Sequence, residues 1–259
     1  MTCGLIMEEL DAFVLQVISD AGALPEDSMR LELLGRRLAP LPPEEIALFF
    51  DCLYKIDPRH LKGSSPRNAS KVRRALMNEE RLREILGQEK YSGVLIAAMR
   101  LGLRKVSRLF SELPPHRRGA SGYEHEEEAR MEYVSLGMKR TLSKSRSKDT
   151  LDRLLSDPDP IVISNILNNP RTTERDVLKI ASKRPNSPRI LKLLAGHGKW
   201  SKRYDVINAI ALNPYSPPRL SIAILEILLA QDLKIIMKSD AVHPQVRMSA
   251  KDIYENKKV

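Results

Sequence analysis

Apolar residues recur at three- and four-residue steps along the first 112 residues, the spacing of one face of an α-helix. Near the start, one such stripe ends at Ile18 and Gly22 follows as a stop signal. The same spacing predicts four further helices, over residues 25–37, 46–56, 70–86 and 94–110. No useful length alternates with the period of two that strands require. The pattern predicts an N-terminal helical domain over residues 1–112.

The sequence changes character after residue 112. Residues 114–122 are rich in Pro, Gly and charge and offer no apolar face to bury. Residues 124–142 begin with acidic side chains and end with basic ones, which is the polarity that complements a helix dipole. A short polar, basic stretch follows over residues 143–148. We therefore expect residues 113–148 to be a charged linker with a connecting helix.

Prolines divide the remaining sequence into short helical segments. Two blocks, ISNILNNPRTTER and INAIALNPYSPPR, align at a shift of 44 residues, so that Asn169-Pro170 meets Asn213-Pro214 and Thr172 meets Ser216. We expect the Asn to end a helix in the left-handed conformation, the Pro to prevent its continuation, and the Ser or Thr to cap the next helix. A period near 44 is typical of repeats built from helical pairs.

On these junctions, residues from about 149 to 252 resemble a bacterial HEAT-like solenoid of the leucine-rich-repeat-variant kind, in which NP-x-T/S-P junctions separate short helices. The resemblance implies an α-solenoid over residues 149–259, in proteins that are scaffolds or binding surfaces far more often than catalysts. Some leucine-rich-repeat-variant proteins carry an iron–sulfur centre, but Cys3 and Cys52 cannot supply four thiolate ligands. The predicted fold class is all-α: an N-terminal helical domain followed by a HEAT-like α-solenoid.

Composition narrows the class of protein further. Aromatic residues make up only 5% of the chain, which favours helices over strands. No apolar run approaches the length of about 18 residues that spans a membrane, and no basic region of a signal peptide precedes the first apolar residues. Two cysteines are too few for a disulfide scaffold. We expect a cytoplasmic protein with no membrane partner.

The formal net charge of +10 is unevenly placed. Residues 1–112 carry a net charge of +1 and residues 151–259 a net charge of +7. Within the latter, residues 171–203 hold ten basic residues and two acidic ones. Such a stretch is typical either of a surface that binds an anionic partner or of a solvated helical face.

The candidate partner- or anion-binding residues are six basic residues in the second half of this stretch and two aromatic residues at its end: Arg184, Arg189, Lys192, Lys199, Trp200, Lys202, Arg203 and Tyr204. An aromatic ring beside Lys or Arg forms a cation–π surface that receives bases, phosphates or aromatic side chains. Because Trp200 and Tyr204 are four residues apart, the alternative is that both pack between adjacent repeats.

No catalytic, cofactor-binding or metal-binding residue is predicted. His125 and Glu128 share a helical face, but a metal site would need two further ligands. The segment 196–200, GHGKW, lacks the first glycine and the hydroxyl residue of a phosphate-binding loop. Cys52 lies on an apolar helix and is expected to be a small core residue. For a catalytic role of the basic stretch, Asp205 beside Tyr204 is the one candidate pair of a carboxylate and an aromatic residue.

We therefore expect a non-enzymatic protein-interaction scaffold with an unidentified protein partner and no cofactor. The alternative is a nucleic-acid-binding helical-repeat protein, akin to DNA-repair proteins that hold the duplex backbone on a basic concave surface. The two differ in where the basic residues of 171–203 lie: one concave face favours nucleic acid, and scattered positions favour the scaffold.

Overall fold

The computed structural model describes residues 2–56, 65–118 and 134–258. Across these residues the protein has sixteen α-helices and no β-strand, which confirms the predicted all-α class. The chain divides into two compact units, Met1–Glu112 and Leu113–Val259. No helix in the described parts of the chain is long and apolar enough to cross a membrane.

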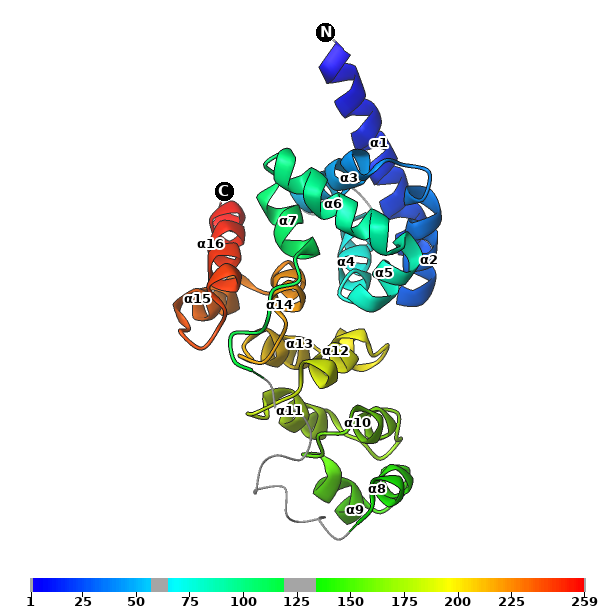
Figure 1. The fold of residues 1–259 in the computed structure, drawn as a ribbon, viewed down its shortest axis with the longest axis vertical. Helices are drawn as coiled ribbons and strands as arrows, with labels where there is room; N and C mark the ends of the chain where they lie inside the picture. The colour runs from blue at the N-terminus through cyan, green and yellow to red at the C-terminus, as the bar shows by residue number, and fades with distance from the viewer. Residues whose placement is uncertain (1, 57–64, 119–133, 259) are drawn as a thin grey trace. The chain divides into compact units, whose positions relative to one another are not determined.

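The first unit is a bundle of helices (Figure 1). Its helices are α1 (Thr2–Ala23), α2 (Asp27–Leu38), α3 (Pro43–Lys55), α4 (Ser65–Ala75), α5 (Glu79–Leu86), α6 (Gln88–Arg100) and α7 (Arg104–Phe110). Helix α1 packs against α2, α3 and α4, and α3 packs against α6 and α7. The predicted apolar stripes meet in the core, where the Phe110 ring lies 5.0 Å from Phe50 and 4.8 Å from Tyr91 between centroids. These aromatic contacts join α3, α6 and α7.

Two of the predicted helices of this unit are each split in the structure. The helix predicted over 70–86 breaks at residues 76–78, because the Asn78 side chain accepts a hydrogen bond from the Arg81 N–H and so caps a new helix, α5. Ser70 lies inside α4 and not at its start. The helix predicted over 94–110 breaks at Gly102, whose φ of +68° is the left-handed conformation that ends a helix. The Leu103 N–H closes this turn by donating to the Ala98 carbonyl at 2.8 Å.

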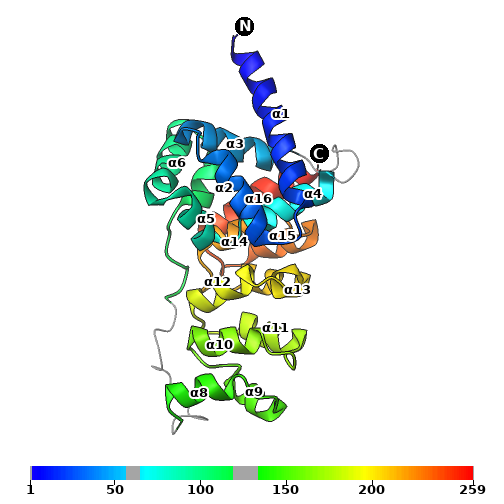
Figure 2. The ribbon, with the colours of Figure 1, turned by 90° about the vertical axis from the view of Figure 1, so that its right-hand side faces the viewer.

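The second unit is a stack of short helices (Figure 2). They are α8 (Leu136–Leu142), α9 (Lys148–Leu154), α10 (Pro160–Leu167), α11 (Glu174–Ser182), α12 (Pro188–Gly196), the 3-10 helix η3 (Trp200–Lys202), α13 (Tyr204–Ala211), α14 (Pro218–Leu225), α15 (Ala230–Lys238) and α16 (Pro244–Lys258). Figure 2 shows α8 beside α9, α10 beside α11 and α12 beside α13 as successive layers. Helix α10 packs against α8 and α12, and α11 packs against α13. The stack therefore has two rows of helices.

The alignment at a shift of 44 residues spans three helices, not a helical pair. Helix α10 begins at Pro160 and α13, its counterpart at this shift, begins at Tyr204, with α11 and α12 between them. The aligned blocks consequently lie in opposite rows of the stack. The prediction of one helical pair for each 44 residues is wrong, because α10, α11 and α12 are only eight or nine residues long and three such helices fit within the period.

The Asn-Pro junctions are held by hydrogen bonds of the asparagine side chain. Among the described residues, none other than glycine has a positive φ, so the predicted left-handed conformation of Asn169 and Asn213 is wrong. The Asn213 amide instead donates to the carbonyls of Ala181 (2.8 Å) and Lys183 (3.1 Å), while its oxygen accepts from the Tyr215 N–H at 3.0 Å. These bonds join the end of α13 to the end of α11 in the neighbouring layer.

Asn169 repeats this arrangement one junction earlier. Its amide donates to the Ser145 carbonyl at 2.8 Å, and its oxygen accepts from the Arg171 N–H at 3.0 Å. Asn169 thereby joins the end of α10 to the turn after α8.

The hydroxyl residues of the junctions bond backward along the chain. The Thr172 hydroxyl donates to the Ile166 carbonyl at 2.5 Å and the Ser216 hydroxyl to the Ile210 carbonyl at 2.6 Å. Neither residue caps the following helix, contrary to the prediction, since the N-cap residue of α11 is Thr173 and that of α14 is Pro217. Each hydroxyl instead adds a second hydrogen bond to a carbonyl near the end of the preceding helix, since Ile166 also accepts from the Asn169 N–H at 3.0 Å and Ile210 from the Asn213 N–H at 3.1 Å.

The described parts of the predicted linker and connecting helix, residues 113–118 and 134–148, belong to the second unit. The Arg117 N–H donates to the Pro214 carbonyl at 3.1 Å, and the His116 ring lies 6.3 Å from that of His243. Within the connecting helix predicted over 124–142, residues 124–133 lie outside the described part of the chain, and α8 begins only at Leu136 because the Ser135 hydroxyl caps it by accepting from the Met138 N–H.

Candidate anion-binding surface

The turn between α12 and α13 contains four of the eight candidate residues, Lys199, Trp200, Lys202 and Arg203. It is closed by His197, whose Nδ1 accepts hydrogen bonds from the main-chain N–H groups of Lys199 (3.2 Å) and Trp200 (3.4 Å). Burial, and secondarily the charge of Lys199, lowers the pKa of His197 below its ordinary value. Because Nδ1 accepts hydrogen bonds only in the unprotonated ring, the neutral state of His197 holds the turn in place.

Trp200 is an internal packing residue. Its side chain is only 2% exposed, and the indole Nε1 donates to the Leu167 carbonyl at the end of α10, at 2.8 Å. The Lys199 ammonium lies 3.9 Å from the centroid of the ring. The indole therefore offers no free face for a base, which corrects its inclusion among the binding residues and agrees with the alternative that it packs between layers.

Tyr204 is likewise engaged within the stack. Its hydroxyl donates to the Asp232 carboxylate on α15 and accepts from the Leu229 N–H at 2.9 Å. Burial, together with the hydrogen bond to Asp232, raises the pKa of Tyr204 to about 12. The hydroxyl is bonded to Asp232 and not to Asp205, so no hydrogen bond from the hydroxyl joins the candidate catalytic pair, and Tyr204 links α13 to α15.

Three of the predicted cations converge. Lys199, Lys202 and Arg203, together with Gly198, line an open depression of about 550 Å³, which we call the basic depression. The side chains of these three basic residues are all exposed to solvent. Arg203 pairs with Glu174 on α11, whose Oε2 lies 3.6 Å from the Arg203 Nε. The depression therefore carries an excess of positive charge, which attracts anions.

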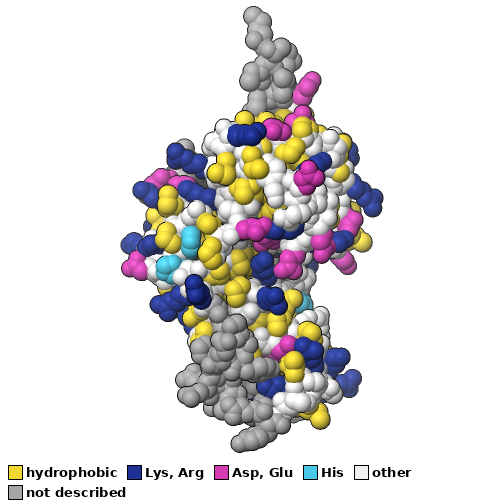
Figure 3. Space-filling view, viewed as in Figure 1, with side chains coloured by type: hydrophobic (Ala, Val, Ile, Leu, Met, Phe, Trp, Pro, Cys, Tyr) yellow, Lys and Arg dark blue, Asp and Glu magenta, His cyan; other side chains and the backbone are white. Residues whose placement is uncertain are grey.

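The other predicted cations lie elsewhere on the second unit. The exposed Arg184 donates from Nη2 to the Leu212 carbonyl at 3.2 Å. Arg189 is exposed in the first turn of α12, and Lys192 is half-buried one turn further on. None of the three lines the basic depression. On the face drawn in Figure 3, Lys and Arg side chains are interspersed with acidic and apolar ones.

His197 and Gly198 also contribute to this surface, although neither was predicted as a binding residue. In the sequence, the segment 196–200 resembles only an incomplete phosphate-binding loop. In the structure, the histidine caps the turn and the glycine forms part of the wall of the depression. The signal for such a cap is a histidine just before a new helical turn, because its ring can accept from the N–H groups two and three residues later. The glycine gives no signal of its own.

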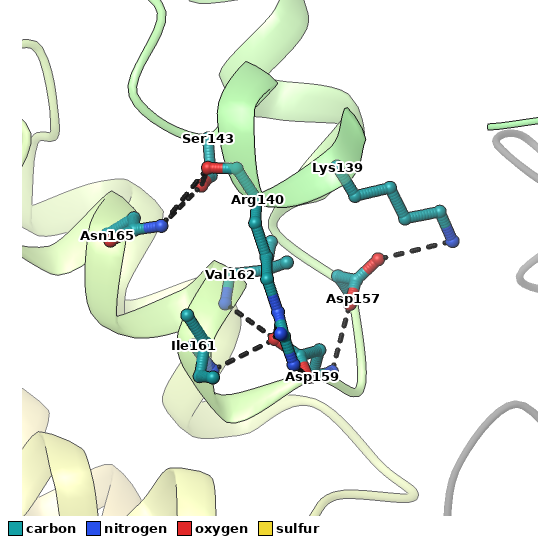
Figure 4. Close-up of polar contacts among 8 residues, drawn as sticks. All are labelled: Lys139, Arg140, Ser143, Asp157, Asp159, Ile161, Val162 and Asn165. Carbon is teal, nitrogen blue, oxygen red and sulfur yellow. Dashed lines mark hydrogen bonds and ion pairs between the residues drawn. The ribbon is translucent and has the colours of Figure 1, made fainter. Parts of the chain in front are cut away.

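A second cluster of charged residues joins α8 to α10 (Figure 4). Asp159 caps α10 by accepting from the N–H groups of Ile161 (3.0 Å) and Val162 (2.9 Å), and it also accepts from Arg140 at 3.0 Å. Burial alone raises the pKa of Asp159, but the hydrogen bonds from Arg140 and the backbone outweigh it and hold that pKa below its ordinary value.

The neighbouring contacts give this cluster a structural role. Lys139 pairs with Asp157 at 3.4 Å, and the Asp157 carboxylate accepts from the Asp159 N–H at 2.9 Å. Both side chains of the Lys139–Asp157 pair are almost fully buried. The two carboxylates thus hold the first helices of the stack together.

The described residues contain no group of three or more His, Cys, Asp or Glu side chains placed to hold a metal ion, and the pair His125 and Glu128 lies outside them. Cys52 is buried in α3. Burial, and secondarily the negative charge of Asp11, raises the pKa of the Cys52 thiol to about 11. A thiol held in its neutral form is a poor nucleophile.

The fold and this surface define an all-α protein whose second unit is a helical stack carrying a basic depression. No protein-family model matches the chain, and no curated protein or solved structure is significantly similar to it.

Proposed function

We propose that the protein is a non-enzymatic interaction module of the cytoplasm, in which a HEAT-like solenoid over the second unit presents a binding surface to a protein partner. The observation that carries this proposal is the distribution of the candidate residues. Trp200 is buried, the half-buried Tyr204 is hydrogen-bonded within the stack, three cations gather at one depression, and Arg184, Arg189 and Lys192 lie apart from it. A basic concave track for nucleic acid would need these cations in one continuous surface.

The internal bonding of the stack supports the same proposal. The polar side chains at its junctions, including those of Asn169 and Asn213, bond the backbone of a neighbouring layer. Such bonds fix the layers against one another, so the surface is formed before a partner arrives. A preformed surface binds with a smaller loss of conformational entropy.

Affinity capture from extract of the native cell tests the proposal. The full chain is compared with a depression triple variant (Lys199→Glu, Lys202→Glu, Arg203→Glu) and with a control triple variant (Lys144→Glu, Arg146→Glu, Arg153→Glu). The control changes three exposed basic residues of the same unit that do not line the depression, so both variants lose the same charge.

We expect the full chain and the control to retain one and the same protein after nuclease treatment, and the depression triple variant to lose it. Loss of the captured protein on nuclease treatment would favour the nucleic-acid alternative. Equal loss by both triple variants would show that net charge, and not the depression, holds the partner.

A further inference from the structure

The basic depression combines three cations with a rigid support. The His197 cap fixes the main chain of the turn, and the hydrogen bond from Trp200 to Leu167 fixes the turn on the stack. The Lys199 ammonium is positioned over the buried Trp200 ring, and Glu174 positions the guanidinium of Arg203 from the side of its Nε. Long cationic side chains held in this way lose less entropy when they bind an anion.

The charge and geometry of the depression fit a compact dianion. Of the described residues, three cations line the depression and one carboxylate, Glu174, forms an ion pair with Arg203, which leaves an excess of two positive charges. The Glu174 contact engages the Nε of Arg203, and no described residue bonds the two Nη groups, which form the fork that takes two phosphate oxygens. A phosphate monoester carries about −1.5 to −2 charges at pH 7 and offers three acceptor oxygens. A single carboxylate offers one charge and fewer acceptors.

One phosphate group fits the site better than a nucleic-acid backbone does. A duplex places phosphates in a row and is bound by a row of cations. In this protein the three cations of the depression are gathered at one place and are not continued by a row. Arg184 is hydrogen-bonded to the Leu212 carbonyl, and Arg189 and Lys192 lie outside the depression.

From these observations we infer that the basic depression binds a phosphorylated serine or threonine side chain of the protein partner. This inference rests on the proposed function and names the chemistry that the partner presents. Lys199, Lys202 and Arg203 contact the phosphate, and Gly198 leaves the wall of the depression open to the peptide, because a Cβ at this position would meet no atom within 4 Å.

The test is an NMR titration of the ¹⁵N-labelled full chain. The probe is a blocked Gly/Ala peptide with one central phosphoserine, and it is compared with the same peptide carrying serine or aspartate at that position. Inorganic phosphate and a short DNA duplex are titrated separately. We expect the phosphopeptide to shift the amide signals of residues 198–203 in a saturable way, with an affinity at least about tenfold above that for the aspartate peptide.

Two kinds of variant make the test specific. Lys202→Glu should weaken phosphopeptide binding at least about tenfold, while Arg153→Glu in the same unit should change it less than about twofold. Gly198→Leu should reduce binding by filling the depression. Its amide spectrum should otherwise be retained, because Gly198 does not have a positive φ that a side chain would strain.

The inference is overturned if the aspartate and phosphoserine peptides bind equally, or if Arg153→Glu weakens binding as much as Lys202→Glu. It is also overturned if the DNA duplex binds more tightly than the phosphopeptide and shifts Arg184 and Arg189 together with the depression. If no phosphopeptide binds but the depression triple variant still loses a nuclease-resistant protein in the capture experiment, the inference fails while the proposed function stands.

Discussion

Asn213 offers the sharpest test of how the helical stack is held together. Its side chain is only 3% exposed and makes three hydrogen bonds to backbone groups, two as donor and one as acceptor. Replacing it with alanine removes all three bonds and leaves buried carbonyls and an N–H without these partners. At about 1 kcal/mol for each net hydrogen bond, the expected loss is about 3 kcal/mol of unfolding free energy.

Glycine at this position separates two explanations of the Asn-Pro junction. If the junction needed a left-handed residue, Asn213→Gly would be nearly neutral. Since φ is not positive here, glycine removes the same three bonds and should destabilise at least as much as alanine. Asn213→Asp should also destabilise, because a carboxylate places a negative oxygen against the Ala181 and Lys183 carbonyls.

The assay is urea unfolding followed by the fluorescence of Trp200, the single tryptophan, which is buried in the second unit. Asn168→Ala is the matched control, since the Asn168 side chain is exposed and bonds only the Ser164 carbonyl of its own helix. This change should cost less than about 0.5 kcal/mol. An Asn213→Gly protein as stable as the wild type would refute the account of the junction.

Three further predictions concern groups whose environment departs from that of the free side chain. His197 and His243 both have lowered pKa values, chiefly through burial, and both accept main-chain hydrogen bonds at Nδ1. Their contribution to the stability of the second unit should be fully present above pH 6.5 and be lost as the pH falls below it. Unfolding midpoints measured between pH 8 and 5 check this prediction. The double variant His197→Asn, His243→Asn should show a smaller change of the midpoint with pH. Trp200→Phe keeps a ring but removes the hydrogen bond to the Leu167 carbonyl. Its free energy of unfolding, measured by urea unfolding followed by circular dichroism, should fall by about 1–3 kcal/mol. In a Cys3→Ser background, Cys52, with its pKa raised to about 11, should resist a thiol reagent at pH 8 until urea unfolds the chain; rapid labelling of the native protein would contradict its burial.

The helical class and most of the helices could be predicted from the sequence, because apolar spacing is a local property that each amphipathic helix carries. The breaks at Asn78 and Gly102 were missed since the apolar pattern continues across them. A capping side chain or a glycine in the left-handed conformation is sufficient to interrupt a helix without changing that pattern.

The contacts of the junction asparagines could not be predicted in the same way. The local pattern correctly placed Asn213 at the end of a helix, but its side chain bonds Ala181 and Lys183, about thirty residues earlier. Contacts of this kind depend on which helix ends lie side by side. The same holds for the binding residues: sequence position put Trp200 among the cations, whereas packing against α10 removed its ring from the surface.

The claim that the basic depression binds a protein and not nucleic acid is tested most directly by a salt titration of duplex DNA binding. The full chain, the depression triple variant and the control triple variant are compared. For a nucleic-acid site, affinity falls with salt by a slope of about 0.9 for each phosphate contact, and the depression triple variant alone would lose those contacts. We predict no measurable DNA binding by the full chain at about 0.15 M salt, and equal losses by the two variants at lower salt. A steep slope for the full chain that only the depression triple variant reduces would contradict the account.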